Sequence, residues 1–106
     1  MAGRRAKRLR ATQRVAVAFL GTTGSLAGEL VDLSTTGLLI RCSQNLEPGT
    51  LGRLGIPLGQ ETIRIVAAVR RQVPSLGLAF EFVQMGSHDR ELLHRLIMRL
   101  QTLARS

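Results

Sequence analysis

The chain has no tryptophan and no tyrosine, and its only aromatic residues are three phenylalanines. Single-stranded nucleic acids stack their bases on aromatic side chains, so such platforms are scarce here. There is also one cysteine, Cys42, which cannot form a disulfide within the chain. These shortages predict a core of aliphatic residues and favour a reducing compartment, so we expect a cytoplasmic domain.

Long apolar runs are absent as well, because charged residues or glycines interrupt every stretch before the roughly 20 residues that span a bilayer. The apolar run at 15–20 follows the pair Arg4-Arg5 and so resembles an export signal. It is shorter than the usual apolar region of about 7 to 15 residues, and its large side chains alternate as in a strand. We therefore assign it to the fold and expect no membrane span.

Groups that perform catalysis are few. The two histidines, His88 and His94, lie six residues apart in a helical pattern and so on different faces, with no cysteine or carboxylate at ligand spacing. No glycine-rich turn matches a Walker loop or a dinucleotide fingerprint. The sequence predicts neither an enzyme nor a metal site, and no cofactor.

Positive charge is concentrated at the N-terminus. The net charge is +8, and residues 1–14, the N-terminal arm, hold six basic residues and no acidic one: Arg4, Arg5, Lys7, Arg8, Arg10 and Arg14. Five of the six are arginines, whose planar fork donates paired hydrogen bonds to a phosphate or to the O6/N7 edge of guanine. We expect an anionic partner at this arm; the alternative is a solvated tail.

The remainder, residues 15–106, has the hydrophobic pattern of one small β-rich domain. Apolar side chains alternate with the period of a strand at 15–20, 63–70 and 76–83, and turn residues bound three more short strands at 26–31, 38–42 and 51–56. We expect five to seven strands in all. After Gly86 the spacing becomes helical, which predicts a helix over about 87–104. Short strands with tight turns and one helix predict a small antiparallel barrel or curled sheet plugged by that helix.

One turn, Asp32-Leu33-Ser34-Thr35-Thr36-Gly37, offers a carboxylate and a hydroxyl where one strand ends. A carboxylate accepts hydrogen bonds from N1 and N2 of guanine, and adenine has no equivalent pair of donors. The alternative is an ordinary turn whose side chains bond their own backbone, with a positive φ at Gly37.

Together with Arg4-Arg5-Ala6-Lys7-Arg8, this turn resembles the PilZ domain family, whose motifs are Arg-x-x-x-Arg and Asp/Asn-x-Ser-x-x-Gly. The resemblance continues to the final helix and implies a six-stranded antiparallel β-barrel with a C-terminal α-helix. It also implies binding of the bacterial second messenger cyclic di-GMP, with relay to a downstream protein. By this resemblance the ligand-binding residues are Arg4, Arg5, Arg8, Asp32, Ser34 and Gly37.

Three questions stay open at this stage. A second Arg-x-x-x-Arg spans Arg10 to Arg14, although we prefer Arg4 and Arg8 because the family leaves several residues between the motif and the first strand. Arg70 or Arg71 is a candidate for contact with a base. The rival functions are a nucleic-acid-binding module and a PilZ-type motility or pilus adaptor that works without ligand.

Overall fold

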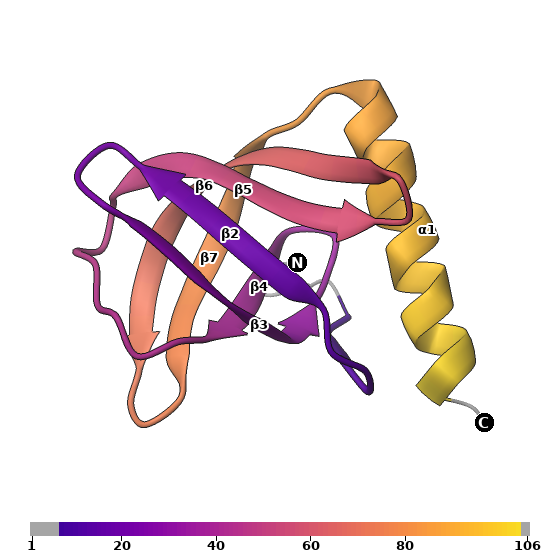
Figure 1. Ribbon diagram of the computed structural model, residues 1–106, viewed down its shortest axis with the longest axis horizontal. Coiled ribbons are helices and arrows are strands. Elements are labelled where there is room, and N and C mark those ends of the chain that lie inside the picture. Colours follow the sequence, from indigo (N-terminus) through magenta and orange to yellow (C-terminus); the bar gives the residue numbers. More distant parts are fainter. Residues whose placement is uncertain (1–6, 105–106) are drawn as a thin grey trace, which may run out of the picture.

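The computed structural model describes residues 7–104, and within them a closed antiparallel β-barrel carries one helix along its side (Figure 1). The predicted six-stranded barrel with a C-terminal helix is confirmed, with one short strand added. The elements are β1 (Leu9–Arg10), β2 (Ala16–Gly21), β3 (Ser25–Leu33), β4 (Gly37–Arg41), β5 (Leu51–Leu58), β6 (Glu61–Val73), β7 (Gly77–Gln84) and α1 (Ser87–Ala104). The strand order is β1-β3-β2-β5-β6-β7-β4, and pairing of β3 with β4 closes the ring.

The barrel is filled by the inward-facing residue of each alternating pair, as the sequence pattern predicts. Phe19 and Phe80 are the aromatic centre, with ring centroids 4.7 Å apart at 52°. The rest of the core is aliphatic, and α1 contributes four buried leucines to it, Leu92, Leu93, Leu96 and Leu100. The helix therefore completes the core rather than merely covering it.

Two polar contacts attach the start of α1 to the β5–β6 hairpin, which Figure 1 shows beside it. Asp89 Oδ1 accepts a hydrogen bond from the backbone N–H of Arg64 at 2.9 Å, and His88 Nε2 lies 2.7 Å from Glu61 Oε1. In residues 7–104 no helix combines the length and the apolar character that a bilayer crossing requires.

The strand bounds differ from the predicted ranges by up to three residues, and three differences bear on the site or the topology. β3 continues to Leu33, so Asp32 lies inside a paired strand rather than in the turn. β6 spans 13 residues and extends past both predicted ends. β1 was not predicted, because two residues cannot display a period. Cys42 is a partly buried residue packed against the core, and burial raises the pKa of its thiol.

The β6–β7 turn contains a strained residue. Leu76 N–H donates to the Val73 carbonyl at 3.1 Å, with Pro74 and Ser75 between them, and Ser75 has a φ of 64°. A positive φ after proline is typical of a type II turn, where glycine is preferred at this position. Ser75 therefore holds a left-handed conformation that costs an L-residue about 1–2 kcal/mol.

We predict that Ser75→Gly stabilises the domain by roughly 0.5 kcal/mol, because the relieved strain exceeds the extra chain entropy of glycine in the unfolded state. Chemical denaturation measures the effect. Ser43→Gly is the matched control, since Ser43 has no positive φ, and it should give no gain. A loss of stability in Ser75→Gly would contradict the strain argument.

His88 should contribute pH-dependent stability. Its hydrogen bond to Glu61 and the charge of that carboxylate raise the His88 pKa above 6.5. A raised folded-state pKa means that the contribution is complete below 6.5 and is lost as the pH rises through the shifted value. We predict that Glu61→Gln lowers the His88 pKa measured by NMR titration, whereas Glu47→Gln, a substitution of a remote carboxylate, leaves it unchanged.

Candidate functional site

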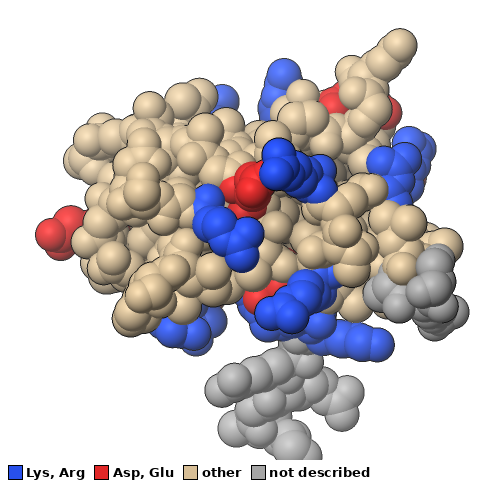
Figure 2. Space-filling view, turned by 60° about the horizontal axis from the view of Figure 1, so that its bottom comes forward, with Lys and Arg blue, Asp and Glu red and all other residues tan. Residues whose placement is uncertain are grey.

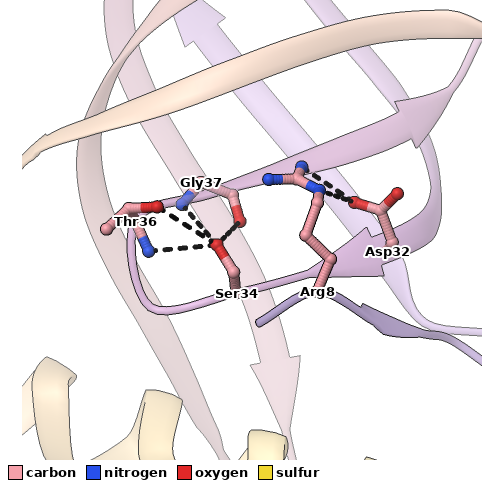
Figure 3. Close-up of polar contacts among 5 residues, drawn as sticks. All are labelled: Arg8, Asp32, Ser34, Thr36 and Gly37. Atoms are coloured by element: carbon pink, nitrogen blue, oxygen red, sulfur yellow. Dashed lines mark hydrogen bonds and ion pairs between the residues drawn. The ribbon is translucent and has the colours of Figure 1, made fainter. Parts of the chain in front are cut away.

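The β3–β4 turn is fixed by Ser34. Its backbone N–H donates to the Gly37 carbonyl at 2.9 Å, and its Oγ accepts from the backbone N–H groups of Thr36 and Gly37, both at 3.2 Å (Figure 3). The Ser34 side chain is buried, with 1% of the residue exposed. The hydroxyl is thus used by the turn itself, which is the ordinary role of serine in such turns.

Gly37 is required for a different reason from the predicted one. The positive φ that the alternative interpretation of the turn gave Gly37 is wrong, because the only glycines with positive φ in residues 7–104 are Gly49 and Gly59. Instead, a Cβ at Gly37 would lie 2.4 Å from the carbonyl oxygen of Phe80 on β7. The missing side chain lets β4 and β7 pair closely just beyond the turn.

We predict that Gly37→Ala destabilises the domain by about 1–3 kcal/mol, the usual cost of forcing backbone apart in a packed structure. Gly55→Ala is the control, because Gly55 also lies in a strand but its added Cβ would meet only Thr62 Cγ2, at 3.6 Å. Thermal melts of the two variants check this. Equal melting temperatures would show that β4 and β7 separate at no cost.

Asp32 is the carboxylate at the centre of the site. It lies on the outer face of β3, and its Oδ1 accepts from Arg8 Nε at 3.0 Å and lies 2.8 Å from Arg8 Nη2. The side chains are 47% exposed for Arg8 and 23% for Asp32. Pairing of β1 with β3 produces this contact, because it places Arg10 opposite Asp32 and so brings Arg8 alongside.

The Arg8–Asp32 pair leaves one carboxylate oxygen and one guanidinium nitrogen unused. Both Arg8 contacts use one oxygen of Asp32, so within residues 7–104 the Oδ2 atom accepts no hydrogen bond and Arg8 Nη1 donates none. Figure 3 shows that the second terminal nitrogen of Arg8 points away from Asp32, on the side of the turn. The pair presents a free acceptor and a free donor side by side, which suits a ligand that carries both.

The two arginine motifs are placed differently. Arg4 and Arg5 lie outside the described residues, so those predicted contacts have no structural description. Arg10 shares the face of Asp32 by register, yet no described hydrogen bond or ion pair joins their side chains. Arg14, 93% exposed, lies with its Nε 3.6 Å from Glu29 Oε2. Among residues 7–14, Arg8 is therefore the one whose side chain holds Asp32.

A row of directly opposite residues continues from Asp32 across the outer face of the sheet. Side chains paired in this way share a face. The row runs over five strands, as Arg10, Asp32, Leu39, Ala79 and Arg71. Arg71 lies three strands from Asp32, at about 14 Å for strands 4.8 Å apart. Arg70 is skipped by a register shift in β6, so of the two candidates only Arg71 belongs to the row.

Leu39 is a site residue that the sequence pattern alone did not single out. It faces outward between the inward residues Leu38 and Ile40, yet only 9% of it is exposed, and it lies outside the core cluster. Three consecutive apolar residues in an alternating strand are the signal that would have indicated it. Leu39 adds an apolar surface to the row, next to the charged pair.

The closed barrel, its packed helix and the Arg8–Asp32 pair beside a serine-fixed turn define a small β-barrel domain with a charged site on its outer wall. The PilZ domain family matches residues 3–99. The chain therefore belongs to the PilZ domain family. In the described part of the chain no three His, Cys, Asp or Glu side chains are grouped to hold a metal ion.

Solved structures have the same fold. The PilZ domain of CeSA, from a cellulose-synthesizing bacterium, is 20% identical with a TM-score of 0.72 and covers 91% of this chain and 99% of its own. The PilZ domain of Escherichia coli YcgR, with cyclic di-GMP, is 23% identical with a TM-score of 0.73. The match covers 96% of this chain and 94% of that one. The larger E. coli YcgR structure, also in complex with cyclic di-GMP, is 22% identical with a TM-score of 0.76. The match covers 96% of this chain and 47% of that one. No curated protein sequence matches this chain.

Proposed function

We propose that this domain is a receptor for cyclic di-GMP and that Arg8 and Asp32 bind one of its guanines. The observation that carries the proposal is the half-occupied ion pair. Within residues 7–104, Asp32 Oδ2 is free to accept from N1 or N2 of guanine, and Arg8 Nη1 is free to donate to O6, N7 or a phosphate oxygen. The cyclic di-GMP held by the YcgR structures supports the choice of ligand.

The other predicted residues take two roles in this proposal. Arg4 and Arg5 complete the arginine motif and bind phosphate or guanine from the arm. Ser34 and Gly37 act by position, since they hold the turn and the β4–β7 approach that fix Asp32. Arg71 lies at the far end of the row, and we expect its guanidinium to stack on a base.

The signal would pass through β1. In the structure α1 packs against β1 as well as β6, so the strand that follows Arg8 contacts the helix. Ligand binding at Arg8 would order the arm and change the surface formed by β1 and α1 for a downstream protein. We propose that this receptor works in the cytoplasm as a binding module without catalysis.

We predict that purified protein binds cyclic di-GMP saturably and does not bind GTP or cyclic di-AMP in calorimetry. Arg8→Ala should weaken binding by about tenfold to over a hundredfold, since a hydrogen bond to a charged group contributes roughly 1.5–3 kcal/mol. Arg53→Ala, which removes an exposed positive charge from β5, is the control. Equal affinities for the two variants would refute the role of Arg8.

Asp32→Asn separates base recognition from simple charge attraction. If Asp32 only repelled the anionic ligand, removal of its charge would tighten binding. If Asp32 accepts from guanine, Asp32→Asn weakens binding, because one of the two carboxylate oxygens is replaced by an NH2 group, which donates and cannot accept. We expect the weaker binding.

The second candidate function is nucleic-acid binding, which the basic arm favours. A protein that neutralises six phosphates loses affinity with a log–log salt slope of roughly −5, whereas a ligand with two phosphates gives about −2 at most. Measuring affinity for cyclic di-GMP and for a DNA duplex between low and physiological salt distinguishes them. A steep slope with DNA and no saturable dinucleotide binding would favour this candidate.

A further inference from the structure

Most of the large apolar side chains that stay exposed lie on one part of the outer barrel wall. Residues 7–104 contain five of them, and three belong to β2, β5 and β7: Leu20 is 67% exposed, Leu51 is 47% exposed and Val83 is 57% exposed. The other two, Met98 and Leu103, are on α1. The site around Arg8 and Asp32 uses none of these side chains.

Strand pairing brings the three side chains of the barrel together. Residues directly opposite one another on paired strands share a face. One outward row crosses β2, β5, β6 and β7, and a second row lies two residues away along β5, at about 7 Å. We call these two rows, with Val83 beside them, the β5–β7 patch: Leu20, Arg53, Val66 and Gln84 form the first row, and Leu51, Ala68 and Glu81 the second.

The β5–β7 patch carries one charge of each sign, at opposite corners. Arg53 and Glu81 are two strands and two residues apart, which is roughly 12 Å. Val66 and Ala68 lie between them on β6. Neither charged side chain has an ion-pair or hydrogen-bond partner within residues 7–104. The fold therefore leaves both charges unpaired at the edges of an apolar centre.

Such a patch is complementary to itself. Homodimers usually have two-fold symmetry, in which the same surface of both copies meets and each contact occurs twice. A two-fold axis through the centre of the β5–β7 patch exchanges its two charged corners, so that Arg53 of each copy lies opposite Glu81 of the other. The two ion pairs would then border a shared apolar centre, as in interfaces with an apolar core and a polar rim.

Other partners and other surfaces fit less well. Residues 1–14 account for six of the eight net positive charges. Figure 2 shows a face on which several groups of Lys and Arg gather around fewer acidic atoms. Two such faces would repel each other, whereas the β5–β7 patch has no net charge. A strongly acidic partner would place its own charge against Glu81.

We infer that the β5–β7 patch is a homodimer interface and that a second copy of this chain covers it. The inference does not depend on cyclic di-GMP binding. Sedimentation velocity of the full chain without ligand tests it, and we expect a monomer–dimer equilibrium that depends on protein concentration. Arg53→Glu and Glu81→Arg should each raise the dimer dissociation constant by about tenfold or more, because each variant places like charges opposite one another twice.

The double variant Arg53→Glu/Glu81→Arg is the decisive measurement. It restores opposite charges across the interface and should recover the dissociation constant of the unaltered chain. The single variants change the net charge in opposite directions, so general repulsion between copies cannot weaken association in both. Arg99→Glu is the matched control, since it makes the same charge change as Arg53→Glu on α1 and should not weaken association.

Circular dichroism melts establish that each variant is folded, which we expect because Arg53 and Glu81 are exposed. The inference is overturned if the unaltered chain stays monomeric up to about 1 mM. It is also overturned if neither single variant weakens association, or if the double variant associates no better than the single ones. Calorimetry with cyclic di-GMP on Arg8→Ala still decides the receptor function in each case, so the two proposals fail separately.

Discussion

Pairing of β3 with β4 closes the barrel, and every feature of the outer site depends on its register. Leu33 and Leu38 are opposite one another and fully buried, which turns their neighbours Asp32 and Leu39 to the outer wall. A slip by one residue would expose the leucines, at about 1.5–3 kcal/mol for each, and turn Asp32 inward. The hydrophobic core therefore sets the position of the charged site, although it contacts none of the charged groups.

The Arg8–Asp32 pair is suited to exchange rather than to stability. A pair this exposed contributes between zero and about 1 kcal/mol to folding, so little free energy is lost when a ligand shares or replaces it. Under the proposed function, the fixed positions of the two groups would reduce the conformational freedom lost on ligand binding. Ser34 has the opposite character, since its buried hydrogen bonds hold the turn and offer nothing to solvent.

Much of this fold follows from the sequence, and the reasons for the exceptions are physical. Apolar alternation and turn residues predicted five to seven strands, and the change of spacing after Gly86 predicted α1 to within its observed bounds. The prediction that Arg8 lies near Asp32 rested on the order of two motifs and on a family resemblance, not on hydrophobic periodicity. Position along a strand does not reveal which residue lies opposite, so the row to Arg71 became visible only with the register. The requirement for Gly37 likewise comes from another strand, β7.

The shortest strand connects the site to the rest of the molecule. Two residues provide too few hydrogen bonds to hold β1 by themselves, but Leu9 packs against the core and pairs with Leu33, and α1 also contacts the strand. The residue after Arg8 is therefore already ordered by burial. Under the proposed function, a ligand bound to Arg8 would act beside a strand that contacts both β3 and α1, and packed interiors leave little room to absorb a shift of that strand.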